Sequence, residues 1–275
     1  MQNSLGVHLD GILGLDVLEQ LRFKIDYSST IVTLCPSTKD SEDPKGSAVR
    51  LIRSGRSLLL PVTFNASIQD RLHLDSGSNF MNLSWNVWER ITQNWHPTRI
   101  IRGLRASGEA EPQSFLTKVD SLQIGKFRLS RPATVVTKQQ AAGAFAQAGA
   151  SGLIGYDVLK QFILTIDLRH NQLFLRPDPQ YHPDPLRYTT IGIQVQTQGT
   201  TFLVASVWEE SPASKAGIRA GDEILKIDGK PLDPQVLDAL SGHLLHRPEG
   251  TTIRLQLRRE GQTFEHTLVC RNLLP

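Results

Sequence analysis

A segment of the chain occurs twice, and this repeat constrains the fold more than any other sequence feature. Residues 11–34 align with residues 152–175 without a gap, at a constant offset of 141. Nine of the 24 aligned positions are identical, and seven of the other 15 exchange one apolar residue for another. Because the offset has the length of a domain, the repeat indicates two related lobes and not a solenoid of short units.

Both copies show the same local pattern. Two apolar residues and a glycine are followed by a short helix, expected over 16–23 and 157–164, and then by a strand with period-two alternation. Asp16 and Asp157 stand where a carboxylate can cap the free N–H groups of a helix start, which explains their recurrence better than catalysis does.

The region between the copies is rich in predicted strands. Residues 58–64 and 71–74 flank the turn-like Asn65-Ala-Ser67 and predict a hairpin. Apolar residues at near-helical spacing predict an amphipathic helix over 84–95. Further strands are expected over 115–124, 127–129 and 133–136, and the Ala/Gly/Gln-rich residues 139–151 predict a loop.

Composition excludes several classes of protein. The 30 Lys and Arg residues nearly balance the 27 Asp and Glu residues, which argues against nucleic acid or an anionic membrane as the main partner. No run of apolar residues is long enough for a transmembrane segment, and the first ten residues lack the features of a signal peptide. The two cysteines, Cys35 and Cys270, have no metal-ligand spacing, so we expect no metal site.

One tripeptide carries possible chemistry, Asp75-Ser76-Gly77. It follows the predicted hairpin and comes about 80 residues before Leu153-Ile154-Gly155. Alone, Asp-Ser-Gly is a common turn sequence and weak evidence for a catalytic site. Its position at the end of an apolar strand, in a chain with a two-lobe repeat, makes it a candidate.

With the hairpin and both closing segments, Ile12-Leu13-Gly14 and Leu153-Ile154-Gly155, the chain resembles the aspartic peptidases. The similarity is greatest to the retropepsin-like branch found in bacteria with an appended PDZ domain. The resemblance implies a mainly β fold, with a retropepsin-like β-barrel lobe and a partial first lobe. It also implies a cell-envelope or periplasmic location.

The resemblance implies an aspartic endopeptidase without a cofactor. In that chemistry two neighbouring carboxylates share one proton, and the ionised one activates the water that attacks a peptide bond. The implied catalytic residues are Asp75, Ser76, whose hydroxyl would hydrogen-bond around the pair, and Gly77, which lets the backbone approach closely. A flap over the cleft is expected within 99–115.

The repeat leaves the partner of Asp75 outside this sequence, because its equivalent position would be 75 − 141 = −66. Three readings stay open: a fragment of a longer protein that holds the missing first lobe, a lobe completed by a second chain, and an inactive relative. A competing function is a non-catalytic PDZ adaptor with a pseudo-protease lobe.

The C-terminal part resembles PDZ domains, which fold as a β-barrel with two helices. The match runs through Ser211–Gly217 and Ala220–Leu232, with a groove helix expected over 234–246 and a closing strand over 251–257. The resemblance implies binding of C-terminal peptides, with Ile191, Gly192, Ile193 and Val195 in the carboxylate-binding loop and the strand after it.

The partners expected for the whole chain are therefore a peptide or protein substrate and C-terminal peptides at the PDZ groove. The expected domains are a first-lobe remnant (1–35), an inter-lobe linker (36–56), a second protease lobe (57–176), a Pro-rich linker (177–187) and a PDZ domain (188–272).

Overall fold

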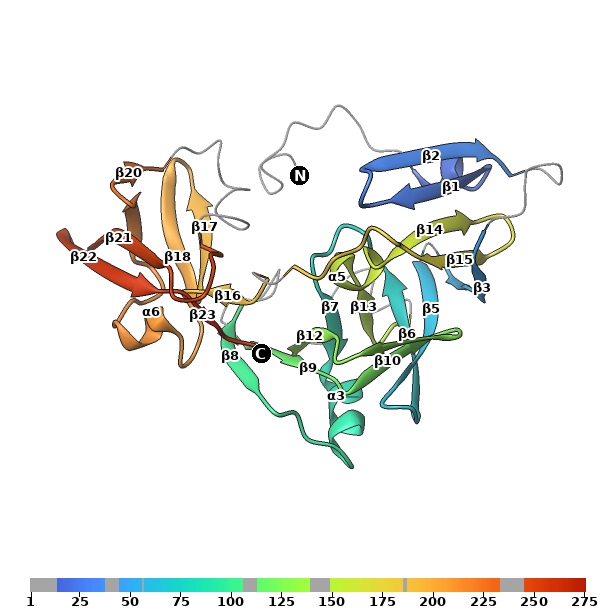
Figure 1. Cartoon of the computed structure of the whole chain (residues 1–275), viewed down its shortest axis with the longest axis horizontal. Coiled ribbons are helices and arrows are strands. Elements are labelled where there is room, and N and C mark those ends of the chain that lie inside the picture. The colour runs from blue at the N-terminus through green and yellow to red at the C-terminus, as the bar shows by residue number, and fades with distance from the viewer. Residues whose placement is uncertain are drawn as a thin grey trace. The chain divides into compact units, whose positions relative to one another are not determined.

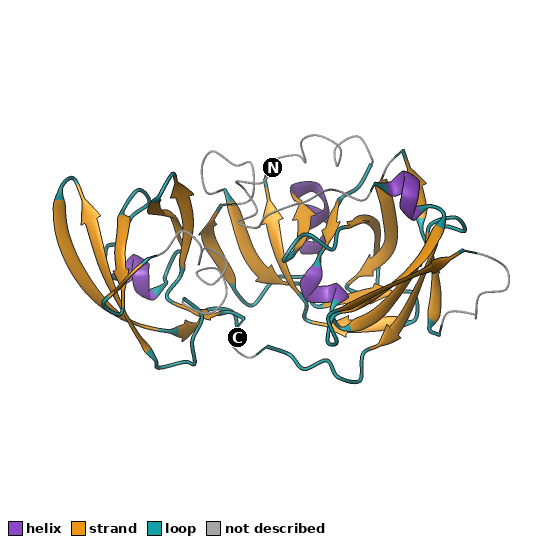
Figure 2. Cartoon of the chain, turned by 90° about the horizontal axis from the view of Figure 1, so that it is seen from above, coloured by secondary structure: helices purple, strands orange, loops and turns teal. Residues whose placement is uncertain are grey.

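The computed structural model describes residues 14–37, 45–55, 57–105, 113–138, 149–184, 187–232 and 245–275. The protein is mainly β, as the sequence predicts, and its helices are short (Figures 1 and 2). The chain divides into two compact units. Unit 1 comprises 1–10, 99–116 and 183–275, and unit 2 comprises 11–98 and 117–182.

The repeat is visible in the elements of unit 2. In the first copy these are α2 (Leu15–Leu18), β1 (Leu21–Asp26) and β2 (Ile31–Pro36), and in the second they are α5 (Tyr156–Leu159), β14 (Phe162–Asp167) and β15 (Gln172–Pro177). Corresponding bounds differ by 141 throughout. Both helices are shorter than predicted, because Leu21 and Phe162 already begin strands that are held by pairing across the sheet.

These strands form a five-stranded sheet in the order β2-β1-β14-β15-β3, in which β3 is Ser47–Arg50. The β1 and β14 strands of the two copies pair antiparallel at its centre. Residues 36–56, expected as a linker, thus contain β3 and also β4 (Ile52–Ser54), which pairs with β5. The predicted domain boundaries themselves stay a prediction.

A second sheet holds the core of unit 2. The predicted hairpin is present as β5 (Ser57–Phe64) and β6 (Ile68–Leu74), and Asn65 and Ala66 take positive φ at its turn. The order around this hairpin is β11-β10-β5-β6-β13-β7-β12. The other members are β7 (Met81–Ser84), β10 (Ser121–Ile124), β11 (Phe127–Ser130), β12 (Ala133–Thr137) and β13 (Gly152–Ile154). Strand β8 (Ile100–Leu104) and most of its neighbour β9 (Ser114–Lys118) belong to unit 1.

Helix α3 (Trp85–Thr92) confirms the amphipathic helix expected over 84–95 and buries Val87, Trp88 and Ile91. The hairpin strand β5 buries six of its eight residues, among them Leu60 and Phe64. Residues 139–148 of the predicted loop lie outside the described residues.

The last part of unit 1 is a PDZ fold. Its main sheet has the order β17-β18-β19-β21-β22, with β20 pairing β19, and β16 pairs with β23 beside it. Its elements are β16 (Thr189–Thr190), β17 (Ile193–Gln198), β18 (Thr201–Val207), α6 (Pro212–Lys215), β19 (Glu223–Ile227), β20 (Lys230–Pro231), β21 (Thr252–Arg259), β22 (Gln262–Val269) and β23 (Arg271–Asn272). The predicted groove helix falls mainly on residues 233–244, which lie outside the described part.

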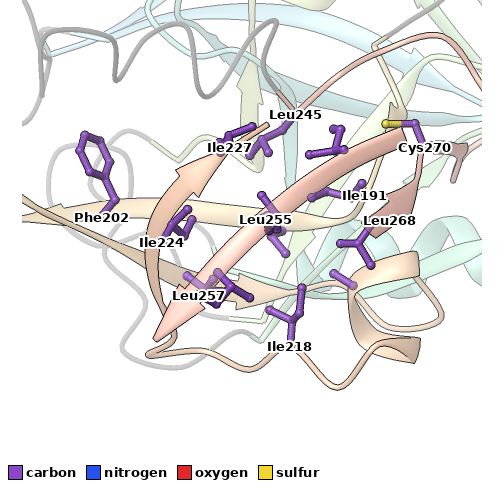
Figure 3. Close-up of a cluster of buried hydrophobic side chains, with 14 residues drawn as sticks. Ile191, Phe202, Ile218, Ile224, Ile227, Leu245, Leu255, Leu257, Leu268 and Cys270 are labelled. Atoms are coloured by element: carbon purple, nitrogen blue, oxygen red, sulfur yellow. The ribbon is translucent and has the colours of Figure 1, made fainter. Parts of the chain in front are cut away.

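Fourteen buried apolar side chains form the core of the PDZ fold (Figure 3). Leu255 and Leu257 of β21 contribute to it, together with Ile224 of β19 and Leu268 of β22. Strand β21 alternates between exposed and buried residues over most of its length, so its apolar residues point inward and its arginines outward. The basic stretch at 254–259 is therefore the solvated side of a strand.

Candidate functional site

Asp75 lies where β6 ends, beside the Leu153-Ile154-Gly155 segment. Strand β13 pairs parallel with β6, placing Leu153 opposite His73 and Ile154 opposite Leu74. The backbone N–H of Asp75 donates to the Ile154 carbonyl oxygen at 3.1 Å. The structure thus brings together two motifs that are about 80 residues apart in the sequence.

The carboxylate of Asp75 closes a turn. Its Oδ1 accepts the backbone N–H of Gly77 at 2.9 Å, and its carbonyl oxygen accepts the N–H of Ser78 at 3.3 Å. This is the hydrogen-bonding pattern of an Asx-turn. Asp75 is half-buried, whereas Ser76 and Gly77 are exposed. Within the described part of the chain, no contact of Asp75 is with a second carboxylate.

Gly155 shows why the closing segment ends in glycine. A Cβ at this position would overlap the carbonyl oxygen of Phe80 and lie 2.6 Å from that of Ser78. The next residue, Tyr156, donates its N–H to the same Ser78 carbonyl oxygen at 2.7 Å. The missing side chain therefore allows the loop after Asp75 to pack directly against the start of α5.

His73 precedes this turn, with its Nδ1 3.0 Å from the Leu74 carbonyl oxygen. Burial lowers the pKa of His73, because it disfavours the charged ring, and the negative charge of Asp75 opposes part of that shift. The ring is therefore mainly neutral at neutral pH.

The second candidate site is the loop before β17 in the PDZ fold. The sequence predicts that Ile191 and Ile193 bind peptide, and both side chains are buried in the PDZ core, where Figure 3 labels Ile191. Only their backbone groups are thus available to a ligand. Val195 packs against the same core from a partly buried position.

Strand β17 lies at one end of its sheet, and the described residues pair it with β18 alone. Ile193 is opposite Val207, and the neighbouring Trp208 N–H donates to the Gly192 carbonyl oxygen at 2.9 Å. In an antiparallel ladder this makes Ile193–Val207 a non-hydrogen-bonded pair. The N–H and C=O of Ile193 consequently point away from β18, toward the open edge of the sheet.

The same holds for Val195, which lies opposite Val204 just after a register shift caused by one extra residue in β18. The Val204 N–H donates to the Asp222 carbonyl oxygen, and the Val204 carbonyl oxygen accepts the Gly221 N–H, both at 2.8 Å. Both backbone groups of Val204 therefore face away from β17. The backbone groups of Val195 therefore also face the open edge. Ile193 and Val195 together present a row of donors and acceptors to which an extended peptide can pair.

Gly192 sits at the start of this edge with φ +82°, a conformation that favours glycine. A Cβ here would overlap Ser211 and lie 3.3 Å from Leu273. The Gly192 N–H donates to the Thr190 hydroxyl oxygen at 3.2 Å. Ser211 and Leu273, both distant in sequence, therefore lie against this loop.

Three further residues, to which the sequence pattern assigned no binding role, position this loop and the start of β17. Thr190 and Ser211 contact Gly192 directly, and Gln194 alternates with the edge-facing residues of β17. Only Ser211 had a recognisable signal, because it precedes Pro212 as an N-cap and accepts the Ser214 N–H at 3.1 Å.

The described residues contain no cluster of His, Cys, Asp and Glu able to hold a metal ion. No helix in the described ranges has the length and apolar character needed to cross a membrane.

Comparison with known proteins supports the PDZ part of the chain. Residues 189–268 match the PDZ domain family. A probable CtpA-like serine protease of Staphylococcus haemolyticus is 24% identical over 203 residues, which are 71% of this chain and 39% of that protein. A carboxy-terminal-processing protease of Bartonella bacilliformis is 39% identical over 71 residues, which are 26% of this chain and 16% of that protein. The chain thus spans about two fifths or less of these curated relatives.

Among solved structures, a retropepsin-like aspartic protease from Rickettsia conorii matches 48% of this chain and 96% of its own, at 18% identity and a TM-score of 0.33. A likeness at this level leaves the aspartic peptidase identity unsupported. The PDZ part of the predicted resemblance is confirmed.

The predicted function, an aspartic endopeptidase with an Asp dyad and an activated water, is wrong. The curated relatives are described as CtpA-like serine protease and carboxy-terminal-processing protease. The assignment of Asp75, Ser76 and Gly77 as site residues stays a prediction.

Proposed function

We propose that this chain recognises peptides for a protease, and that its PDZ domain binds the C-terminal segment of a polypeptide as an added strand on β17. The observation that carries the proposal is the open edge of β17, where the backbone groups of Ile193 and Val195 point away from β18. Addition of a strand to an exposed sheet edge is a general mode of peptide recognition, in which main-chain hydrogen bonds supply affinity.

The loop before β17 suits the end of such a peptide. Gly192 turns the chain so that the Ile193 N–H is the first donor on the open edge of β17. A terminal carboxylate would lie close to this N–H. The buried side chains of Ile191 and Ile193 fix the loop to the core, so binding requires little ordering of the protein. Apolar binding energy would come from Val195 and from ligand side chains, since the two isoleucines are occupied in the core.

Proteolysis is the second part of the proposal. The relatives that share sequence with this chain are described as proteases. Two of them are described as carboxy-terminal processing proteases. A domain that captures polypeptide C-termini would select substrates for such an activity. The bound peptide is then a substrate or a product of cleavage.

The binding step is tested with the whole chain and a fluorescent hexapeptide that ends in a hydrophobic residue with a free carboxylate. We expect saturable binding, and we expect the C-terminal amide of the same peptide to bind at least about tenfold more weakly, because one charge-assisted hydrogen bond is lost. A third peptide, N-methylated at the penultimate residue, removes one ladder hydrogen bond without changing the protein.

Equal binding of all three peptides would contradict recognition by strand addition. Gly192→Ala should abolish binding of the free-acid peptide, because its Cβ overlaps Ser211. Gly199→Ala is the matched control, since Gly199 also has positive φ but has open space around it. The proteolytic part is tested separately by mass spectrometry of longer peptides with free and amidated ends. Absence of cleavage in both would contradict it and leave the binding result intact.

A further inference from the structure

Strand β8 (Ile100–Leu104) belongs to the same compact unit as the PDZ domain, although more than 80 residues separate them in the sequence. Figure 1 shows β8 running up to β16 and β23. The sequence predicts a flap within 99–115, of which residues 106–112 lie outside the described part. Residues 99–105 make a series of contacts with the PDZ fold.

The first contact is with Gln194, in the middle of the proposed peptide-binding strand. The Arg105 N–H donates to the Gln194 side-chain oxygen at 2.8 Å, and the Gln194 amide nitrogen donates to the Arg105 carbonyl oxygen at 3.2 Å. The side-chain amide thus satisfies both backbone groups of Arg105, as a residue of a neighbouring strand would. The Ser206 hydroxyl also donates to the Gln194 side-chain oxygen and fixes its orientation.

The second contact lies at the other end of β8. The Arg99 guanidinium donates to the Leu273 carbonyl oxygen at 2.7 Å. Leu273 borders the peptide loop, because its side chain lies 3.3 Å from the position of a Cβ on Gly192. The segment 99–105 is therefore attached at both ends to residues that border the proposed carboxylate-binding loop.

Between these ends β8 lies directly against β18 and the loop that follows it. Gly103 has φ +83°, and a Cβ on it would overlap the Val207 carbonyl oxygen. Val207 is the residue opposite Ile193 in the β17–β18 pair. In the loop after β18, the Glu209 N–H donates to the Arg102 carbonyl oxygen at 2.9 Å.

We propose that the segment 99–105 is an accessory part of the peptide-binding site, with Gln194 as the positioning residue that couples it to β17. This inference rests on the proposed peptide binding. A docked segment restrains β17 in the conformation that pairs with a peptide, which lowers the ordering cost of binding. Because coupling between two equilibria is reciprocal, a bound peptide must also stabilise the docking of the segment.

Two variants are designed to separate the segment from the PDZ fold, and a third variant is their control. Gln194→Ala removes both hydrogen bonds to Arg105. Gly103→Ala places a methyl group against Val207 while leaving residues 183–275 unchanged. Gly55→Ala is the control, because Gly55 also has positive φ (59°) and has no heavy atom within 4 Å of an added Cβ.

The test measures the affinity of the free-acid hexapeptide by fluorescence anisotropy and the backbone hydrogen exchange of residues 99–105. We expect Gln194→Ala and Gly103→Ala each to weaken binding at least about fivefold, and Gly55→Ala to bind like the wild type. In the wild type, peptide should slow exchange in 99–105, and this protection should disappear in Gln194→Ala. Thermal unfolding establishes that each variant is folded.

Unchanged affinity in both variants, together with no peptide-dependent protection of 99–105, would overturn the inference and leave the proposed function standing. If the wild type binds none of the peptides, the proposed function fails. The coupling is then judged in the free protein, where Gly103→Ala should accelerate exchange in 193–198, and an unchanged rate would overturn it.

Discussion

Lys24 and Thr165, which occupy equivalent positions of the repeat, lie directly opposite each other in the antiparallel pair of β1 and β14. In the repeat, Phe23 is equivalent to Leu164 and Ile25 to Ile166. In the sheet these partners are interchanged, because Phe23 is opposite Ile166 and Ile25 is opposite Leu164. The two copies are therefore related by a local two-fold axis that passes between Lys24 and Thr165. The sequence repeat is thus a structural symmetry, and the surroundings of the two copies can be compared position by position.

The surroundings differ most at the second strand of each copy. Val32 is 61% exposed and Leu34 49% exposed on β2, whereas their equivalents on β15, Leu173 and Leu175, are 0% and 1% exposed. We predict that Leu173→Ala lowers the free energy of unfolding by about 2–5 kcal/mol through lost burial and a cavity. Val32→Thr should change it by less than about 0.5 kcal/mol.

Urea denaturation of both variants beside the wild type measures this difference. A large loss of stability for Val32→Thr would show that β2 is covered in solution, and would contradict the exposure seen in the described residues.

Asp167 gives the prediction for pH. It is buried, and the largest effect on its carboxyl is burial, which opposes ionisation. Hydrogen bonds from His170, Arg22 and Ser37 outweigh burial and lower the pKa of Asp167 below its usual range. A lowered pKa in the folded state stabilises the protein above pH 4, and the contribution is lost as the pH falls through the folded-state pKa.

Asp167→Asn should therefore lower the free energy of unfolding at pH 7 by about 1.5–3 kcal/mol, the usual value of a hydrogen bond to a charged group. The difference from the wild type should shrink as the pH falls below 4. Asp26→Asn at the equivalent turn is the control. Asp26 accepts the Ser29 N–H at 3.1 Å at an exposed site, so its replacement should have a smaller effect. Equal losses for both would contradict the importance of burial at Asp167.

Tyr27 offers a stabilising change. Its hydroxyl is buried and has no hydrogen-bond partner among the described residues, and burial raises the pKa of Tyr27 to about 12. Its ring lies edge-to-face on Tyr156, with centroids 5.3 Å apart. Tyr27→Phe removes the unsatisfied hydroxyl and keeps the ring contact, so we expect a gain of about 1 kcal/mol.

Differential scanning calorimetry should show this gain as a higher unfolding temperature. Tyr156→Phe preserves the same ring contact and is the control, with an expected change close to zero. Destabilisation by Tyr27→Phe would mean that the hydroxyl has a partner outside the described residues.

The turn at Asp75 predicts a difference between two substitutions. Asn retains a side-chain oxygen that can accept the Gly77 N–H, whereas Ala cannot. We expect Asp75→Ala to lower the free energy of unfolding by about 1 kcal/mol and Asp75→Asn to change it little. Hydrogen exchange at the Gly77 amide reports the bond directly, and equal protection in both variants would exclude the turn as described.

The sequence determined the features that depend on neighbouring residues. It predicted the hairpin of β5 and β6 from its turn residues and α3 from its apolar spacing. It also predicted the PDZ domain from the stretch that contains Ser211 and Pro212, and the repeat from direct alignment. These features follow from local backbone preferences and from the periodicity with which a strand or helix buries one face.

Only the tertiary structure decided what distant segments do to one another. It pairs β1 with β14, ends α2 and α5 after one turn, buries the side chains of Ile191 and Ile193, and attaches the segment 99–105 to the PDZ domain. No local pattern encodes these outcomes, because a strand edge or an apolar side chain can be satisfied by many partners along the chain. The packing of the whole fold selects one of them, and among the described residues that selection pairs β17 with β18 alone.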